Sequence, residues 1–321
     1  MLFTQRSTVR RRGLTAVGFA AVLALGPAAC GSSDGSGSDH SMPGMAHGTT
    51  RTASASASAS PSADSGSGSD PAMGGMPGMD HMTAGNGLAD AEDGYRFTGP
   101  DAAVGAARPI RYRFAISGPD GKPVTGFALD QTVRMHFYVV RSDLTGFQHV
   151  HPTMAEDGTW TADLAALSPG SWRLFASFIP DSGAGKGTDF VLSRTVTVPG
   201  AAARTPLPAA ARTTEVDGYT VTVDGELMAG MTHLLTVHLT KNGTPVTDLQ
   251  PYLDTYAHLT AFHEGDTAFA HLHPTTPAVG NHGGPDLSFH AELPASGNWR
   301  LFLQFRTAGH LHTAALTLHV A

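Results

Sequence analysis

Cysteine is almost absent from this chain. Of its 321 residues only Cys30 is a cysteine, and it lies near the N-terminus. The rest of the chain therefore has no disulfide, no cysteine nucleophile and no blue-copper centre, which needs a thiolate ligand. A folded domain of this chain must be stabilised by the burial of apolar side chains instead.

Basic charge is also scarce. The chain has 20 Lys and Arg against 27 Asp and Glu. Four of the arginines lie in the first 12 residues, before an apolar run, and without them the balance is 16 − 27 = −11. A surface of that sign repels phosphate backbones, and no basic stripe is present elsewhere, so we expect no nucleic-acid partner.

Long apolar runs are missing except at residues 13–29. That run follows Arg10-Arg11-Arg12 and is shorter than the roughly 20 residues that a membrane span needs, so it predicts a signal peptide over residues 1–29. Ala28-Ala29-Cys30 before a Gly/Ser-rich tail resembles a bacterial lipobox. This resemblance implies lipidation of Cys30 and anchoring at the outer face of the cytoplasmic membrane, with plain secretion as the alternative. Arg11-Arg12-Gly13-Leu14 resembles a twin-arginine signal, so the Sec and Tat export routes both stay open.

No long stretch has a helical period. Residues 31–88 are mostly Gly, Ser, Ala and Pro, a composition that cannot bury enough apolar surface to order itself.

From Tyr95 onward, short alternating apolar runs separated by turn residues predict an all-β fold, two tandem Ig-like antiparallel β-sandwiches. The predicted strands are 110–116, 132–141, 147–150, 159–164, 172–178 and 190–198, then 219–223, 234–240, 256–263, 268–272, 287–293, 299–305 and 313–320. The predicted organisation is a signal peptide at 1–29, a disordered Met-rich tether at 30–90, a first sandwich at 91–199, a Pro/Ala linker at 200–213 and a second sandwich at 214–321.

An internal repeat supports the two-domain reading. Phe147-Gln148-His149-Val150-His151-Pro152 returns 122 residues later as Phe269-Ala270-His271-Leu272-His273-Pro274. The same offset carries His136 onto His258, while an offset of 127 carries Trp172-Arg173-Leu174-Phe175 onto Trp299-Arg300-Leu301-Phe302. The tryptophan segment predicts a central core strand.

The repeated histidines predict metal ligands. In each His-x-His pair both side chains project from one face of a strand, and a third histidine thirteen residues upstream can join them from the preceding strand. Imidazole suits Cu(II), Zn and Ni. The candidate triads are His136, His149 and His151 in the first copy and His258, His271 and His273 in the second. Because the second copy is richer in histidine, adding the second-rank pair His310 and His312, we expect the better site there. The alternative is that these histidines only hydrogen-bond the strand end.

The tether carries a separate signal. Six of the eleven methionines fall within 41 residues that have no core to fill. Thioether sulfur is a soft ligand that prefers Cu(I), and regular spacing on a flexible chain lets several sulfurs wrap one ion. The candidate ligands of the tether are Met42, Met45, Met73, Met76, Met79, His81 and Met82.

Two resemblances follow from these residues. The segment 73–82 resembles the Met-rich segments of bacterial periplasmic copper-resistance proteins. Residues 95–321, with their Phe-x-His-x-His-Pro element, resemble exported Ig-like sandwiches of the YtkA/FixH-like and CopC-like kind, in an actinobacterial type of lipoprotein. A CopC-like carrier binds copper through a histidine at its mature N-terminus, and a mature start at Cys30 does not match that feature.

The sequence therefore predicts a cell-surface metal-binding protein, a copper buffer or carrier, with Cu(I) on the tether, Cu(II) at the histidines and zinc as the alternative metal. A structural or interaction module of the cell envelope, with structural histidines and an unidentified protein partner, is the competing hypothesis. We expect no enzyme, because no carboxylate recurs beside the histidines in both copies to act as a general base.

Overall fold

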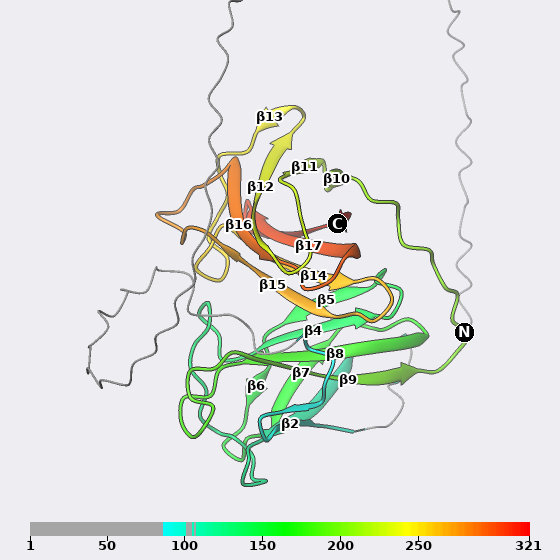
Figure 1. Ribbon diagram of the computed structural model, residues 1–321, viewed down its shortest axis with the longest axis vertical. Coiled ribbons are helices and arrows are strands. Elements are labelled where there is room, and N and C mark those ends of the chain that lie inside the picture. The colour runs from blue at the N-terminus through cyan, green and yellow to red at the C-terminus, as the bar shows by residue number, and fades with distance from the viewer. Residues whose placement is uncertain (1–85, 101–104, 106) are drawn as a thin grey trace, which may run out of the picture. The chain divides into compact units, whose positions relative to one another are not determined.

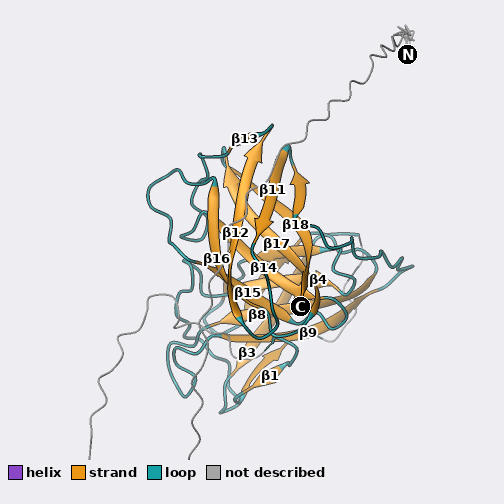
Figure 2. Ribbon diagram, turned by 45° about the horizontal axis from the view of Figure 1, so that its top comes forward, coloured by secondary structure: helices purple, strands orange, loops and turns teal. Residues whose placement is uncertain are grey.

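The computed structural model describes residues 86–100, 105 and 107–321. Every regular element within these ranges is a strand, as Figure 2 shows, which confirms the predicted all-β class. None of the described residues forms a helix long and apolar enough to span a membrane. The predicted signal peptide, Cys30 and the methionines and histidines of the tether lie outside the described residues.

The first repeat has two antiparallel sheets, coloured cyan to green in Figure 1. One sheet has the order β1-β2-β3-β7-β6 and the other the order β5-β4-β8-β9. The strands are β1 (Ala91–Glu92), β2 (Tyr95–Thr98), β3 (Ile110–Ser117), β4 (His136–Arg141), β5 (Phe147–Val150), β6 (Thr153–Met154), β7 (Trp160–Leu164), β8 (Gly170–Phe178) and β9 (Phe190–Val198).

The strands of the second repeat, yellow-green to red in Figure 1, form one continuous path. Its order is β10-β11-β12-β16-β15-β14-β17-β18, with β13 beside β12, because β15 pairs with both β14 and β16. The strands are β10 (Thr213–Val216), β11 (Tyr219–Asp224), β12 (Thr232–Lys241), β13 (Thr244–Pro245), β14 (Ala257–His263), β15 (Phe269–Pro274), β16 (Asp286–Glu292), β17 (Gly297–Thr307) and β18 (His310–Val320).

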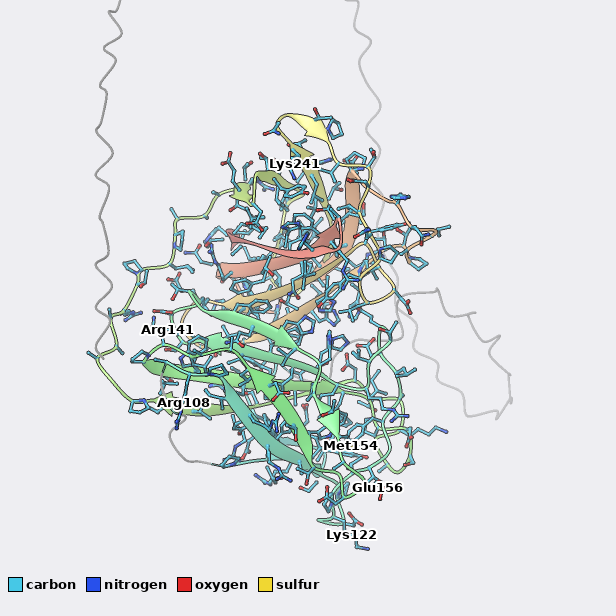
Figure 3. The ribbon with its side chains drawn as sticks, turned by 180° about the vertical axis from the view of Figure 1, so that it is seen from behind. Arg108, Lys122, Arg141, Met154, Glu156 and Lys241 are labelled. Atoms are coloured by element: carbon cyan, nitrogen blue, oxygen red, sulfur yellow. The ribbon has the colours of Figure 1, made fainter. Side chains whose placement is uncertain are left out.

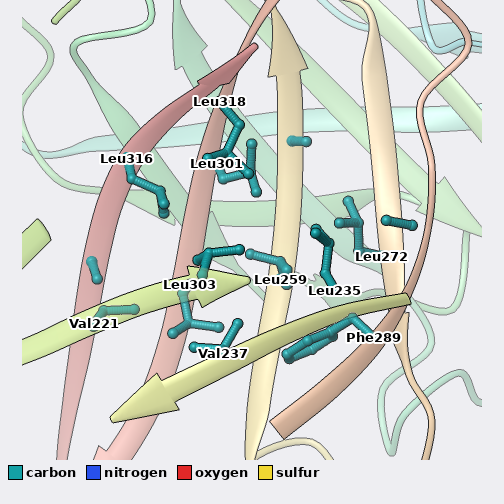
Figure 4. Close-up of a cluster of buried hydrophobic side chains, with 14 of the residues drawn as sticks. Val221, Leu235, Val237, Leu259, Leu272, Phe289, Leu301, Leu303, Leu316 and Leu318 are labelled. Atoms are coloured by element: carbon teal, nitrogen blue, oxygen red, sulfur yellow. The ribbon is translucent and has the colours of Figure 1, made fainter. Parts of the chain in front are cut away.

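Each sandwich has its own core, built by alternation along the strands. In β3, Tyr112, Phe114 and Ile116 are buried, whereas Arg111 and Arg113 are exposed and Ala115 is half-buried. Trp172 and Trp299 are both buried, and each donates its indole N–H to the carbonyl oxygen four residues upstream, which confirms their core role. Figure 4 shows the leucine- and valine-rich core of the second repeat.

One predicted strand begins too early. The alternation favoured 132–141, but β4 begins at His136 because residues 130–133 form a tight turn. Gln131 and Thr132 have φ angles of 43° and 76°, in the left-handed region that a β-branched residue rarely adopts. The second repeat forms the same turn, with Leu253 at 56° and Asp254 at 59°. Such strained conformations persist only where the surrounding packing determines them.

The two repeats pack through an aromatic cluster to which both contribute. Phe147 stacks on Phe302 with ring centroids 4.1 Å apart and 6° between the planes. Their counterparts at the repeat offsets, Phe269 and Phe175, also contact each other, at 5.7 Å. Corresponding faces therefore meet reciprocally, as they do in the isologous interface of a two-fold dimer, here within one chain.

Arg141, labelled in Figure 3, fastens the start of the linker to the first repeat. Its guanidinium lies at the end of β4, pairs with the buried carboxylate of Asp143 and donates to the carbonyl oxygens of Pro169 and Ala203, the latter at 2.7 Å. The chain that connects the repeats is thereby held where it leaves the first sandwich.

Candidate metal centre

The six repeated histidines lie on the faces through which the two repeats meet. In the first repeat Tyr138 of β4 is the cross-strand partner of His149 of β5, and the two rings stack at 4.3 Å. Because side chains alternate along a strand, His136 and His151 share that face. The second repeat repeats the pattern, with Thr260 opposite His271. The predicted same-face arrangement is therefore present in both copies.

Histidines of the two repeats also contact each other. The His258 ring lies 4.8 Å from the His149 ring and 5.4 Å from the His136 ring, centroid to centroid. The His271 ring lies 4.6 Å from both the His258 ring and the His273 ring. The two triads that the sequence predicted as separate sites thus form one contiguous group of imidazoles at the inter-repeat interface.

Within the described residues, the first triad is the group whose ligand atoms converge. One ring nitrogen from each of His136, His149 and His151 lies within 4.8 Å of the others. His136 Nδ1 and His149 Nε2 are 3.1 Å apart. Two nitrogens bound to one ion at about 2.0–2.1 Å in tetrahedral geometry are separated by roughly 3.3 Å. The triad thus fits one ion with small movements of the side chains.

Neighbouring oxygens fix which nitrogens of the triad carry hydrogen. His136 Nε2 faces the backbone oxygen of Asp130 at 3.3 Å and its carboxylate at 3.5 Å, and both groups only accept. His149 Nδ1 faces Gln304 Oε1 at 2.7 Å. In the neutral rings, His136 Nδ1 and His149 Nε2 therefore present lone pairs to each other. His151 Nε2 is buried and has no hydrogen-bond partner. A cation between these three nitrogens would satisfy all of them.

Burial keeps the His149 and His151 imidazoles neutral at physiological pH. Loss of solvation, followed by the charges of neighbouring histidines, holds the pKa of His149 well below its usual value. The same causes lower the pKa of His151 to about 4. Neutral imidazole is the form that binds a metal, so no proton has to leave these rings at pH 7 before an ion enters.

Asp130 supplies negative charge beside the triad. Burial alone would raise the pKa of its carboxyl group, but the hydrogen bond and charge of His136, together with the charges of His271 and His273, lower that pKa to about 2. The ionised carboxylate of the first repeat therefore lies in the field of imidazoles from both repeats. Such a carboxylate orients a ligating histidine and raises its basicity.

The second triad does not converge in the same way. His258 uses both ring nitrogens, Nδ1 with Gln131 Oε1 at 2.9 Å and Nε2 with the Tyr138 hydroxyl at 3.0 Å. His271 Nε2 lies 3.5 Å from Gln131 Nε2, while its Nδ1 is buried without a hydrogen-bond partner. The geometry therefore favours the first repeat, although the histidine content favoured the second. A metal at His258, His271 and His273 stays a prediction.

The second-rank pair, His310 and His312, stays a prediction, and its two members differ in their surroundings. His312 donates or accepts through both nitrogens, with Asp217 Oδ2 at 2.7 Å and the Thr307 hydroxyl at 3.0 Å. His310 is exposed at the start of β18. The contacts of His312 are those of a histidine that fastens a loop to the end of a strand.

Sequence reasoning missed the groups that orient the histidines. Asp130 and Gln131 lie in the turn before β4, where the repeat offset places Tyr252 and Leu253 in the second copy. Gln304 corresponds to Ser177 in the first copy. None of these polar residues recurs, so the comparison of the two copies gave no signal for them.

Comparison with known proteins places the chain in a family. No curated protein matches this chain. Among solved structures, bovine butyrophilin is similar at 10% identity over 71% of this chain and 99% of that chain, with a TM-score of 0.20. Red sea bream transglutaminase reaches 11% identity over 71% and 31%, with a TM-score of 0.19. Domains 4 and 5 of the S-layer protein SbsC reach 10% over 73% and 99%, with a TM-score of 0.21.

These structural similarities are too low to bear on function, and the YtkA/FixH-like or CopC-like resemblance stays an expectation. The family model matches twice, over residues 89–196 and 214–321, so it covers both sandwiches and most of the chain. The chain therefore belongs to the family described as Domain of unknown function (DUF8832), of which it carries two tandem copies.

Proposed function

We propose that this protein binds a transition-metal ion, with copper as the leading candidate, through His136, His149 and His151. One observation carries the proposal. His136 Nδ1 and His149 Nε2 lie 3.1 Å apart, a ring nitrogen of His151 converges with them, and His151 Nε2 is buried without a hydrogen-bond partner. Leaving a buried polar atom unpaired costs about 1–3 kcal/mol, and one cation removes that cost for all three nitrogens. Zinc suits three imidazoles equally and is the alternative metal.

In this proposal the protein is a metal buffer or carrier of the cell envelope and not an enzyme. It is exported, and it is either anchored to the membrane by lipid at Cys30 or secreted. The Met-rich tether takes up Cu(I) through Met42, Met45, Met73, Met76, Met79 and Met82 with His81, and the histidine centre holds copper as Cu(II). Its ligand is the metal ion, with no role for nucleic acid. The support for the tether comes from the sequence alone.

The test is metal analysis of the full mature chain after exposure to micromolar Cu(I), Cu(II) or Zn(II). Two variants test which site binds which metal ion. One replaces His149 and His151 with alanine, and the other replaces Met73, Met76, Met79 and Met82 with leucine. We expect one Cu(II) or Zn(II) to be lost from the histidine variant alone and Cu(I) from the methionine variant alone. His319→Ala is the matched control, because His319 is an exposed histidine whose ring is hydrogen-bonded to Asn298 and which is not among the candidate ligands.

The competing function is an interaction module whose histidines are structural. The contacts of His258 favour it for the second triad, since both of its nitrogens are satisfied within the protein. If the wild-type chain and both variants retain no more metal than a metal-free control protein, the metal-binding proposal fails and the interaction module is the better account.

A further inference from the structure

The side chain of Gln304, in the second repeat, contacts the histidine triad of the first repeat. It lies in β17, is 4% exposed, and its strand neighbours are His258 on one side and Thr313 on the other. Its amide nitrogen donates to the Thr313 hydroxyl at 3.4 Å, which turns its oxygen toward His149. That oxygen lies 2.7 Å from His149 Nδ1 and is the sole link of this ring to a polar group of the second repeat among the hydrogen bonds of the described residues.

The amide oxygen decides between two states of the triad. With hydrogen on Nδ1, His149 keeps its lone pair on Nε2, which faces His136 Nδ1, and the site is open to a cation. With hydrogen on Nε2 instead, that N–H donates to His136 Nδ1 across 3.1 Å and closes the site with an ordinary hydrogen bond. The second state would set the Nδ1 lone pair against the Gln304 oxygen, which is repulsive. Gln304 therefore disfavours the closed state.

The other repeat shows what happens without this residue. At the repeat offsets, His271 is the counterpart of His149 and Ser177 is the counterpart of Gln304. The short Ser177 side chain donates to Asp189 at 3.4 Å within its own repeat. His271 Nδ1, the atom that corresponds to the anchored nitrogen of His149, is left buried without a partner. The triad that has its amide converges, and the triad that lacks it does not.

We propose that Gln304 is a positioning residue of the metal centre, supplied by the second repeat to keep His149 Nε2 of the first repeat free for the ion. This inference rests on the proposed metal-binding function and adds the statement that one repeat alone does not make a competent site. A hydrogen-bonded partner on the second nitrogen of a ligating histidine sets its tautomer and orientation, and its loss weakens metal affinity by about 10- to 100-fold.

Two measurements on the full mature chain test the proposal. The first is the tautomer of His149 in the metal-free protein, read from long-range ¹H–¹⁵N NMR correlations of the ring. We expect hydrogen on Nδ1 in the wild type and a shift toward Nε2 in Gln304→Leu. The second is Cu(II) and Zn(II) titration, in which Gln304→Leu should bind about 10- to 100-fold more weakly. Gln304→Met serves as a second apolar replacement should the leucine variant fold poorly.

Gln304→Glu separates positioning from mere space filling. A carboxylate also accepts from His149 Nδ1, so we expect this variant to keep wild-type affinity or exceed it, whereas a space-filling role predicts that leucine is tolerated and the buried charge is not. Gln148→Leu is the matched control: Gln148 precedes His149 in the chain, and its amide bonds the backbone of Ala165, away from the triad.

The outcomes distinguish this inference from the proposed function. If the wild type binds metal and Gln304→Leu binds it equally well, or if the His149 tautomer is the same in both, the positioning role is wrong and the metal site stands. If the wild-type chain binds no metal, the proposed function is wrong, and the role of Gln304 in it falls too, whatever the tautomer of His149.

Discussion

His136 and His258, which occupy the same position in the two repeats, stack on each other with ring centroids 5.4 Å apart and 13° between the planes. Their hydrogen-bond partners nevertheless differ. His136 turns one nitrogen toward His149 and the other toward Asp130, whereas His258 is held by Gln131 and Tyr138. Equivalent positions in a duplicated fold thus hold two buried rings with different hydrogen-bond partners.

The first prediction follows from that difference. His149→Ala or His151→Ala should reduce Cu(II) or Zn(II) affinity by at least 100-fold, because each removes one of three converging ligands. His258→Ala should retain the ion but lower the free energy of unfolding by about 1–3 kcal/mol, since it leaves the Tyr138 hydroxyl and the Gln131 amide buried without their partner. Metal titration and urea denaturation of the same variants check both halves. Loss of metal from His258→Ala alone would contradict the assignment.

The second prediction concerns acid stability of the metal-free protein. Burial, followed by neighbouring histidine charges, holds the pKa of His149, His258 and His271 well below 6.5, and burial lowers the pKa of His151 to about 4. A histidine whose pKa is lowered in the folded state contributes its full stability above pH 6.5, which is its pKa in the unfolded chain. That contribution is lost as the pH falls through its pKa in the folded protein. The urea midpoint should therefore drop steeply between pH 6.5 and 4. A flat profile over that window would show that these rings are solvated.

The third prediction concerns Asp189, a buried carboxyl group that accepts a hydrogen bond from Ser177. Burial, reinforced by the charge of Asp130, raises the pKa of Asp189 well above its usual value. A raised carboxyl pKa gives stability that is full below the unfolded value of 3.8 and is lost as the pH rises through the folded value. Asp189→Asn should therefore be more stable than the wild type at pH 8, by on the order of 1–3 kcal/mol, and equal to it near pH 4. Urea denaturation at the two pH values measures this, and equal differences at both would refute it.

The fourth prediction links the inter-repeat contact to the metal. Phe302→Ala removes the ring that stacks on Phe147 and should cost about 3–5 kcal/mol of stability. Because Gln304 is two residues along the same strand, the variant should also weaken metal binding. Phe114→Ala, a truncation in the first repeat's own core, should cost similar stability without changing affinity in the folded protein. Titration at a temperature where both variants remain folded compares them.

Much of the fold could be predicted from the sequence because alternation along a strand is a local signal. Tyr112, Phe114 and Ile116 occupy alternate positions of β3, and the structure buries all three. The turn at 130–133 could not be predicted, since neither Gln131 nor Thr132 is a residue that favours positive φ. Its conformation depends on packing against the other repeat, and packing of that kind is not encoded in nearby residues.

The candidate site could be predicted only as far as its ligands recur. The repeat pointed to all six histidines, and the structure brings all six together. The groups that contact the converging triad, Gln304 and Asp130, are each present in one copy only, and Gln304 is also far in sequence from His149, the ring that it contacts. Gln304 and His149 are 155 residues apart in the chain, and a contact over that separation produces no periodic pattern in the sequence. Only the folded structure reveals it.

The reciprocal contacts of Phe147 with Phe302 and of Phe269 with Phe175 have an evolutionary consequence. A pair of identical subunits joined through this face would receive every mutation twice, so a glutamine gained beside one histidine would be gained beside its twin. Joining the two units on one polypeptide released them from that obligation. Gln304 and Ser177 could then diverge, so that the two sides of a symmetric contact came to carry different residues at equivalent positions.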